Sequence, residues 1–109
     1  MRTILLPATL MILVAATALA QDAAKGAEVY AAQKCSMCHS IGGKGNAKGP
    51  LDGVGGKLTA DEIREWIVDP AAMTAKTKAP RKPAMPAKYA SLPKADLDAL
   101  VAYLASLKK

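Results

Sequence analysis

Two cysteines and a histidine lie together in one five-residue segment, Cys35-Ser36-Met37-Cys38-His39. Two thiols at this spacing, followed at once by a histidine, form the pattern at which a c-type haem is attached. Each thiol adds to one vinyl group of the macrocycle, and the two intervening residues let one turn of backbone span that edge. The histidine then falls beneath the iron. The segment therefore predicts a covalent haem on Cys35 and Cys38, with His39 as the proximal ligand.

Other sites that use paired cysteines fit the remaining sequence less well. Zinc takes four ligands, usually Cys and His, whereas the two cysteines and one histidine of this chain all lie in the motif. A thioredoxin-like dithiol is expected among alternating strands and helices, and the later chain shows helical periodicity. A disulfide within the motif would close a loop too short to constrain much unfolded chain. Haem attachment is favoured, and the dithiol, zinc and disulfide interpretations stay open.

The N-terminal segment has the pattern of a secretory signal peptide. Arg2 is followed by an apolar run that ends in Ala18-Leu19-Ala20, a small-x-small cleavage sequence. We predict cleavage before Gln21, so that residues 1–20 are removed and residues 21–109 form a single domain. Export to the bacterial periplasm agrees with the motif, because c-type haem is attached after secretion. The alternative is a retained segment that tethers the same domain to the membrane.

The first predicted helix covers residues 22–34 and ends just before the motif. At 3.6 residues per turn, one face carries Ala23, Ala27, Tyr30, Ala31 and Lys34. Gly26 inside this helix costs about 1 kcal/mol relative to alanine. Close approach of another backbone at Gly26 would offset that cost, and a tolerated surface glycine is the alternative.

A second helix is predicted to begin at a capping box, in which Thr59 and Glu62 satisfy the first free backbone amides. Pro70 ends this helix by Asp69. Its apolar stripe consists of Ile63, Trp66 and Ile67. We expect Trp66 in the core, where it also touches the cofactor. The last helix runs from position 93 or 94 to 107, with a buried face made of Leu97, Leu100, Val101, Leu104 and Leu107.

Two segments between these helices are expected to be loops. Residues 41–56 hold most of the chain's glycines together with Pro50, which suits a chain that wraps closely around a flat ligand and forms neither helix nor strand. Residues 71–91 contain several prolines and basic side chains and no acidic residue.

A thioether sulfur is a suitable sixth ligand for haem iron, and two methionines in the second loop are candidates. Met85 lies between Pro83 and Pro86, and prolines limit the conformational freedom of a segment that must hold the sulfur over the iron. Met73 is the rival, although it follows the end of the second helix closely. We predict Met85 as the ligand, with Met73 and an open or otherwise occupied site as alternatives.

Residues 24–107 resemble the small class I cytochromes c. The matching features are the motif at 35–39, Gly26 with Tyr30, Gly49-Pro50, the segments 66–70 and 100–104, and Met85-Pro86. The resemblance implies an all-α protein with a compact cytochrome c fold, whose N- and C-terminal helices cross near Gly26 and Tyr103, with haem-wrapping loops between them. It also implies that the Pro50 carbonyl accepts a hydrogen bond from Nδ1 of His39, which fixes the orientation of the ligand.

The predicted coordination determines the predicted function. With His39 and Met85 bound, the iron has no vacant position for a substrate, and Met/His ligation favours a raised potential. We therefore expect a periplasmic one-electron carrier with one haem c, cycling between Fe(III) and Fe(II), and no enzymatic activity. The alternatives are a cytochrome subunit of a periplasmic dehydrogenase or oxidase and, if Met85 does not bind, a haem sensor or haem enzyme with an open iron site.

The charge of the chain indicates the kind of partner. Its formal net charge is +6, and basic residues gather at positions 44–57 and 76–88. These side chains would form a positive rim that steers the protein toward redox partners with acidic docking surfaces; a scatter of solubilising lysines is the alternative. An exported chain without a basic and aromatic array is not expected to bind nucleic acid, and no small-molecule substrate is expected. Membrane contact is expected only if the N-terminal segment is retained.

Overall fold

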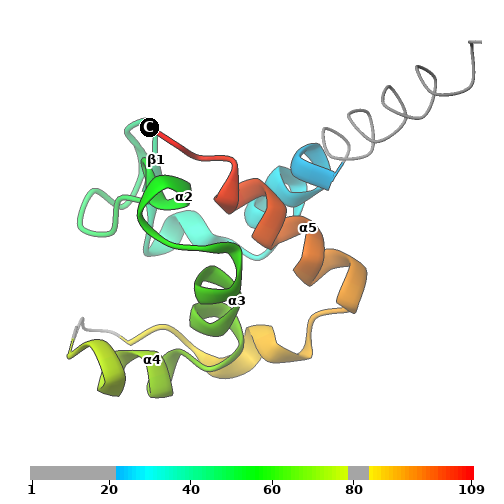
Figure 1. Cartoon of the computed structure of the whole chain (residues 1–109). Coiled ribbons are helices and arrows are strands. Elements are labelled where there is room, and N and C mark those ends of the chain that lie inside the picture. The colour runs from blue at the N-terminus through cyan, green and yellow to red at the C-terminus, as the bar shows by residue number, and fades with distance from the viewer. Residues whose placement is uncertain (1–21, 79–83) are drawn as a thin grey trace, which may run out of the picture.

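The computed structural model describes residues 22–78 and 84–109, so the predicted signal peptide and the prolines at 80 and 83 lie outside the described residues. The described elements, in chain order, are an N-terminal helix (residues 22–32), η1 (Cys35–Met37), β1 (Ser40–Ile41), β2 (Lys44–Gly45), α2 (Val54–Lys57), α3 (Ala60–Val68), α4 (Pro70–Thr77), η2 (Ala87–Ser91) and α5 (Lys94–Ala105) (Figure 1). The predicted all-α class is confirmed. Among these residues, no helix has the length and apolar character needed to cross a bilayer.

The N-terminal helix crosses α5 at Gly26. A Cβ atom at this position would collide with the carbonyl oxygen of Ala99 and with Cβ of Tyr103. Next to the crossing, the rings of Tyr30 and Tyr103 pack edge to face, with centroids 6.0 Å apart and an interplanar angle of 62°. Such a pair contributes about 0.5–1.5 kcal/mol beyond its buried area. The predicted crossing of the first and last helices near Gly26 and Tyr103 is confirmed.

The buried face of the N-terminal helix differs from the predicted one. Gly26 and Val29 are buried, whereas Ala31 and Lys34, both placed on the predicted face, are exposed. Val29 offers more apolar area than an alanine, and the hydrophobic effect therefore turns its side of the helix inward. The helical residues also stop at position 32, and Lys34 adopts a left-handed conformation with φ of 57°.

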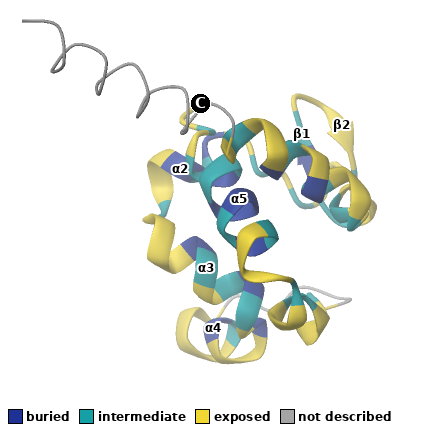
Figure 2. Cartoon of the chain, turned by 90° about the vertical axis from the view of Figure 1, so that its right-hand side faces the viewer, coloured by how far each residue is buried: buried dark blue, intermediate teal, exposed yellow. Residues whose placement is uncertain are grey.

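Helices α3 and α5 form the centre of the core. Ile63 and Ile67 of α3 belong to one buried cluster with Val29 and with Leu97, Leu100, Val101 and Leu104 of α5. Buried positions are prominent along α5 (Figure 2). Full burial of each such side chain is worth about 1.5–3 kcal/mol. Leu107 was predicted on the same face of the last helix, but α5 ends at Ala105 and Leu107 packs half-buried against the cluster from the following segment.

The predicted start and end of the second helix are confirmed in α3. The Glu62 amide donates to Thr59 Oγ1 at 3.2 Å, and the Thr59 amide donates to Glu62 Oε1 at 3.0 Å. These two bonds form the capping box that the sequence indicated. The helix ends at Val68, two residues before Pro70, because proline disfavours helical backbone in the residue that precedes it.

The loop predicted for residues 71–91 is wrong over much of its length, because α4 and η2 lie within it. Pro70 occupies the first turn of α4, where its fixed φ suits the helix and no hydrogen bond is lost. The Asp69 carboxylate then caps α4 by accepting from the Ala72 amide at 3.3 Å. The same proline therefore ends one helix and begins the next.

The glycine-rich segment at 41–56 also contains regular structure that was not predicted. Strands β1 and β2 pair antiparallel through a turn at Gly42 and Gly43, whose φ values of 60° and 79° suit a two-residue hairpin. Further along, α2 lies against the C-terminal segment of the chain. The Gly55 amide donates to the Leu107 carbonyl at 2.8 Å, and Lys108 Nζ donates to the Gly55 carbonyl at 3.0 Å. Contacts distant in sequence thus support a helical turn that glycines alone would not favour.

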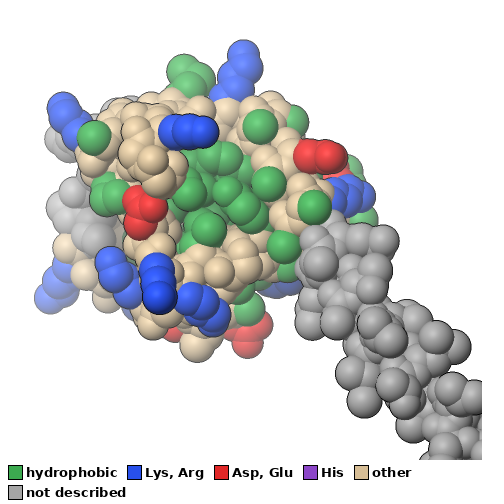
Figure 3. Space-filling model, turned by 90° about the horizontal axis from the view of Figure 1, so that it is seen from above, with side chains coloured by type: hydrophobic (Ala, Val, Ile, Leu, Met, Phe, Trp, Pro, Cys, Tyr) green, Lys and Arg blue, Asp and Glu red, His purple; other side chains and the backbone are tan. Residues whose placement is uncertain are grey.

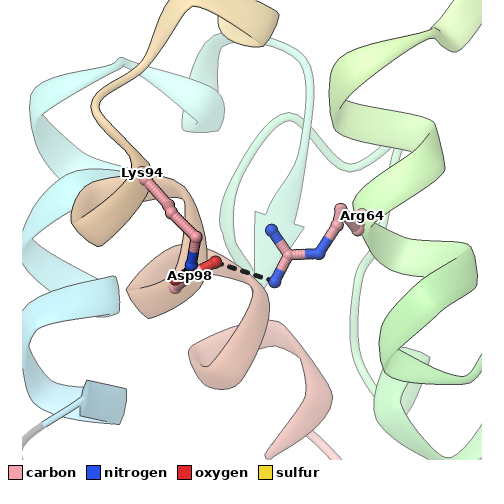
Figure 4. Close-up of polar contacts among 3 residues, drawn as sticks. All are labelled: Arg64, Lys94 and Asp98. Atoms are coloured by element: carbon pink, nitrogen blue, oxygen red, sulfur yellow. Dashed lines mark hydrogen bonds and ion pairs between the residues drawn. The ribbon is translucent and has the colours of Figure 1, made fainter.

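A cluster of ion pairs joins α5 to its neighbours. Asp98 accepts from Arg64 of α3 at 2.9 Å and from Lys94, one turn earlier in α5, at 2.6 Å (Figure 4). The hydrogen bond from Lys94, supported by that from Arg64, lowers the pKa of Asp98. Lys25 lies 3.4 Å from Asp96 and links the N-terminal helix to α5. These pairs hold at the surface the same helices that pack in the core.

Candidate functional site

The two cysteines and the histidine of the motif are brought together by the 3₁₀ turn η1. The amides of Cys38 and His39 both donate to the Cys35 carbonyl, at 3.1 Å and 2.9 Å. Both cysteine side chains are half-buried. Burial raises the pKa of the Cys35 thiol, although the nearby charge of Lys88 acts in the opposite direction. One turn of backbone therefore presents two sulfurs and an imidazole to the same region of the molecule.

The imidazole of His39 is held by a backbone hydrogen bond. Its Nδ1 donates to the carbonyl oxygen of Gly49 at 3.0 Å. The prediction that Pro50 supplies this carbonyl is wrong by one residue. A parallel bridge pairs Ser40 with Pro50, and the Ser40 amide donates to Gly49 while its carbonyl accepts from Leu51. Because carbonyls alternate in direction along extended backbone, Gly49 faces the histidine and Pro50 faces away.

The protonation state of this imidazole follows from its hydrogen bond. A carbonyl only accepts, so Nδ1 of His39 carries a proton, and in the neutral ring the lone pair then lies on Nε2. This is the tautomer that a metal-binding histidine adopts when its other nitrogen is held by a backbone carbonyl. The carbonyl of His39 itself accepts from the Asn46 amide at 3.0 Å, so the hairpin after the motif packs back on the histidine.

Two adjoining cavities, of about 260 Å³ and 280 Å³, lie beside the motif. Together they fall within the ~300–1,000 Å³ typical of ligand pockets. Five residues line both cavities: Cys35, His39, Trp66, Met85 and Tyr89. The first is completed by Tyr30, Leu51, Val54, Leu58, Ile63, Ile67, Leu100 and Leu104. The second is completed by Lys34, Cys38, Thr74, Ala84 and Pro86. The first cavity is therefore mainly apolar, and the second is more polar.

The structure distinguishes the two candidate methionines. Met85 is half-buried and lines both cavities together with His39. Met73 is only 5% exposed, lies within α4 and lines neither cavity. Trp66 is half-buried and lines both cavities, which is the position expected of a residue that touches a cofactor. Pro50 is exposed and lines neither cavity.

Several wall residues were not identified from the sequence. Tyr89 of η2 lines both cavities, and burial raises the pKa of its hydroxyl. Lys88 Nζ lies 5.4 Å from the centre of the Tyr89 ring. Because Met85 precedes η2 and is not helical, its four-residue spacing from Tyr89 is no helical signal, and no local pattern in the sequence placed Tyr89. Leu51 and Val54 come from the glycine-rich segment, whose composition gave no sign of an apolar wall, and Leu58 follows it at the end of α2.

The residues around the two cavities fit a haem c. Two thiols are available for the vinyl groups, and an imidazole nitrogen and a thioether sulfur are ligands that haem iron accepts. The leucine, isoleucine and valine side chains that line the first cavity suit a flat macrocycle. The donor set and the wall chemistry therefore agree with the cofactor that the motif predicted.

Comparison with known proteins agrees with this site. A family model described as Cytochrome c matches residues 23–108. The cytochrome c oxidase subunit 2 of Alkalihalophilus pseudofirmus is 33% identical over 93 residues, which cover 77% of this chain and 25% of that protein. The chain thus spans about a quarter of the length of that relative. No solved structure was found to match. The chain belongs to the cytochrome c family, whose members carry haem c and transfer electrons.

Proposed function

We propose that this protein is an exported one-electron carrier, with one haem c bound covalently through Cys35 and Cys38 and its iron ligated by His39 and Met85. The observation that carries the proposal is that His39 and Met85 line the same two cavities as the Cys35 thiol. Met73, the rival ligand, lines neither. Haem supplies a reversible Fe(III)/Fe(II) couple when bound, and a closed His/Met coordination leaves no position for a substrate.

The chain contributes a fixed orientation of the His39 ring and an apolar environment to this redox couple. The Gly49 carbonyl holds the His39 ring in one tautomer, and such a bond raises the basicity of the ligating nitrogen. Trp66 and the aliphatic side chains of α3 and α5 give the first cavity a mainly apolar wall. Low polarity and a neutral thioether ligand both favour the reduced state, which has less net positive charge on the iron.

The visible spectrum of the haem-loaded protein tests the ligands. We expect a low-spin oxidised spectrum with the weak red band of Met–Fe(III). This band should be lost in Met85→Ala and kept in Met73→Ala, the matched control. A high-spin wild type, or one whose reduced form binds carbon monoxide readily at neutral pH, would favour a sensor or haem enzyme. Absence of covalent haem would overturn the proposal as a whole.

We also propose that the redox partners present acidic docking surfaces. Lys34 lines the second cavity, and Lys88 lies beside Tyr89, which lines both. On one face of the molecule, a central group of hydrophobic side chains has several Lys and Arg side chains around it, together with a few Asp or Glu side chains (Figure 3). The predicted rim includes Lys44, Lys48, Lys57, Lys76, Lys78 and Lys88, all exposed, while Arg81 and Lys82 lie outside the described residues. Association rates should fall as salt is added, because screening weakens steering.

The proposed location is the bacterial periplasm. Its support is the signal-peptide pattern at residues 1–20 and the need to attach c-type haem after export. Mass spectrometry of the protein from its native host should show a mature chain that begins at Gln21 and carries one haem. An uncleaved chain in the membrane fraction would instead support a tethered domain.

A second candidate function is a cytochrome subunit of a larger redox complex. The similarity to a cytochrome c oxidase subunit 2 supports this candidate, because this chain matches a quarter of that protein. Size-exclusion chromatography of the native extract separates the two. A carrier should elute as a small free protein, whereas a subunit should co-elute with a larger partner.

A further inference from the structure

One polar group in the walls of the first, mainly apolar cavity lacks a hydrogen-bond partner among the described residues. The hydroxyl oxygen of Tyr30 is buried and makes no hydrogen bond to any residue that the structure describes. Tyr30 lines the first cavity. A buried hydroxyl without a partner costs free energy, whereas a phenylalanine ring would fill the same space without that cost. The presence of a tyrosine here therefore calls for an acceptor that the protein walls do not supply.

The position of the Tyr30 ring is set by its neighbour. Tyr103 packs against it edge to face, with centroids 6.0 Å apart, and Gly26 brings the two helices into contact one turn earlier. Rotation of the ring away from the cavity would break this packing. Burial raises the pKa of Tyr30 to about 12, so the hydroxyl keeps its proton and serves as a donor near neutral pH.

The other walls of the first cavity offer few acceptors. Their side chains are hydrocarbon or sulfur, apart from His39, Trp66 and Tyr89. The Trp66 indole can only donate, and Nδ1 of His39 is engaged with Gly49. An acceptor oxygen must then enter with the group that fills the cavity. Two sources share this chemistry: a carboxylate of the haem, and a water molecule enclosed beside the macrocycle.

We propose that the Tyr30 hydroxyl donates a hydrogen bond to an acceptor oxygen enclosed with the haem, and that this bond favours the reduced state. The inference rests on the proposed haem site. A donor that withdraws negative charge from the haem surroundings stabilises the form with more electron density on the iron. Loss of the hydroxyl should therefore lower the reduction potential.

The test compares Tyr30→Phe with Tyr103→Phe in the haem-loaded protein. Both changes keep a ring and remove one hydroxyl, but only the Tyr30 hydroxyl is among the buried unpaired atoms of the described residues. We expect a lower potential and a lower urea midpoint for Tyr30→Phe than for the wild type, and values near those of the wild type for Tyr103→Phe. Proton NMR of the reduced wild type should show a slowly exchanging hydroxyl proton that is absent in Tyr30→Phe.

The same variants identify the source of the acceptor. If it is a haem carboxylate, Tyr30→Phe should change the pH dependence of the potential. If it is an enclosed water, the potential should shift equally at every pH, and the hydroxyl proton should show exchange peaks with water. An unchanged potential and midpoint in Tyr30→Phe, or equal shifts in both variants, would overturn the inference while leaving the haem site intact. A wild type without covalent haem would remove both this inference and the proposed function.

Discussion

Nδ1 of His39 donates to the carbonyl oxygen of Gly49 at 3.0 Å, and the same oxygen accepts the Ser40 amide at 3.0 Å. The acceptor for the histidine is therefore itself held by the residue that follows the histidine. The hairpin of β1 and β2 closes this arrangement, since Asn46 donates back to the His39 carbonyl. The contacts that hold His39 on the proximal side of the proposed haem site thus all lie within residues 35–51. How firmly they hold His39 depends on how closely the β1–β2 hairpin approaches it.

Gly45 is the residue through which the hairpin approaches His39. Its φ is 111°, and a Cβ atom there would collide with the His39 carbonyl oxygen. Gly43 has φ of 79° but open space around it. We expect Gly43→Ala to lower the free energy of unfolding by about 1–2 kcal/mol, from backbone strain alone. Gly45→Ala should lower it further, because the hairpin must move. Urea denaturation of the haem-loaded proteins measures both, and equal losses would show that the contact is unimportant.

Gly26 allows the N-terminal helix and α5 to touch. In an open helix, Gly→Ala stabilises by roughly 0.5–1 kcal/mol. Here the added methyl would collide with Ala99 and Tyr103, so we expect a loss of about 1–3 kcal/mol from overpacking. The sign of the change is therefore diagnostic. Ala31→Gly, at an exposed position of the same helix, reports the propensity effect alone. A gain in the thermal midpoint for Gly26→Ala would contradict the crossing.

The capping box at the start of α3 makes a separate contribution. Thr59→Ala removes the acceptor for the Glu62 amide and should lower the free energy of unfolding by about 1 kcal/mol. Thr59→Ser keeps the hydroxyl and should behave close to the wild type. The backbone hydrogen bond from Thr59 lowers the pKa of Glu62. Loss of stability in Thr59→Ser equal to that in Thr59→Ala would mean that the hydroxyl bond contributes little.

Asp98 should make stability depend on acid pH. Its folded pKa lies below the ordinary value because Lys94 and Arg64 donate to it. The group therefore stabilises the fold above an unfolded pKa of ~3.9, and this stabilisation is lost as the pH falls through the lower folded pKa. When urea denaturation is measured at a series of pH values from 7 downward, the difference in unfolding free energy between the wild type and Asp98→Asn should shrink at low pH. Lys94→Gln should reduce the loss of unfolding free energy at acid pH more than Arg64→Gln does. The reverse order would contradict Lys94 as the main cause of the lowered pKa of Asp98.

Features that depend on residues close in sequence were predicted from the sequence alone. The order of Cys35, Cys38 and His39 predicted a site that spans one haem edge, and the structure places all three beside one pair of cavities. The capping box and the end of α3 before Pro70 depend on side chains within one turn of the backbone they satisfy. Family membership, which the family model confirms, rested on short motifs of this kind.

Features that depend on distant contacts were decided by the tertiary structure. Which side of the N-terminal helix is buried depends on α5, which takes up Gly26 and Val29 instead of Ala31. The placement of Met85 and not Met73 at the cavities depends on α4, which carries Met73 into the core. Whether the Gly49 or the Pro50 carbonyl accepts the hydrogen bond from His39 depends on the bridge between Ser40 and Pro50. Each is a competition for space or for a hydrogen bond between segments far apart in the chain, so local sequence patterns do not contain the answer.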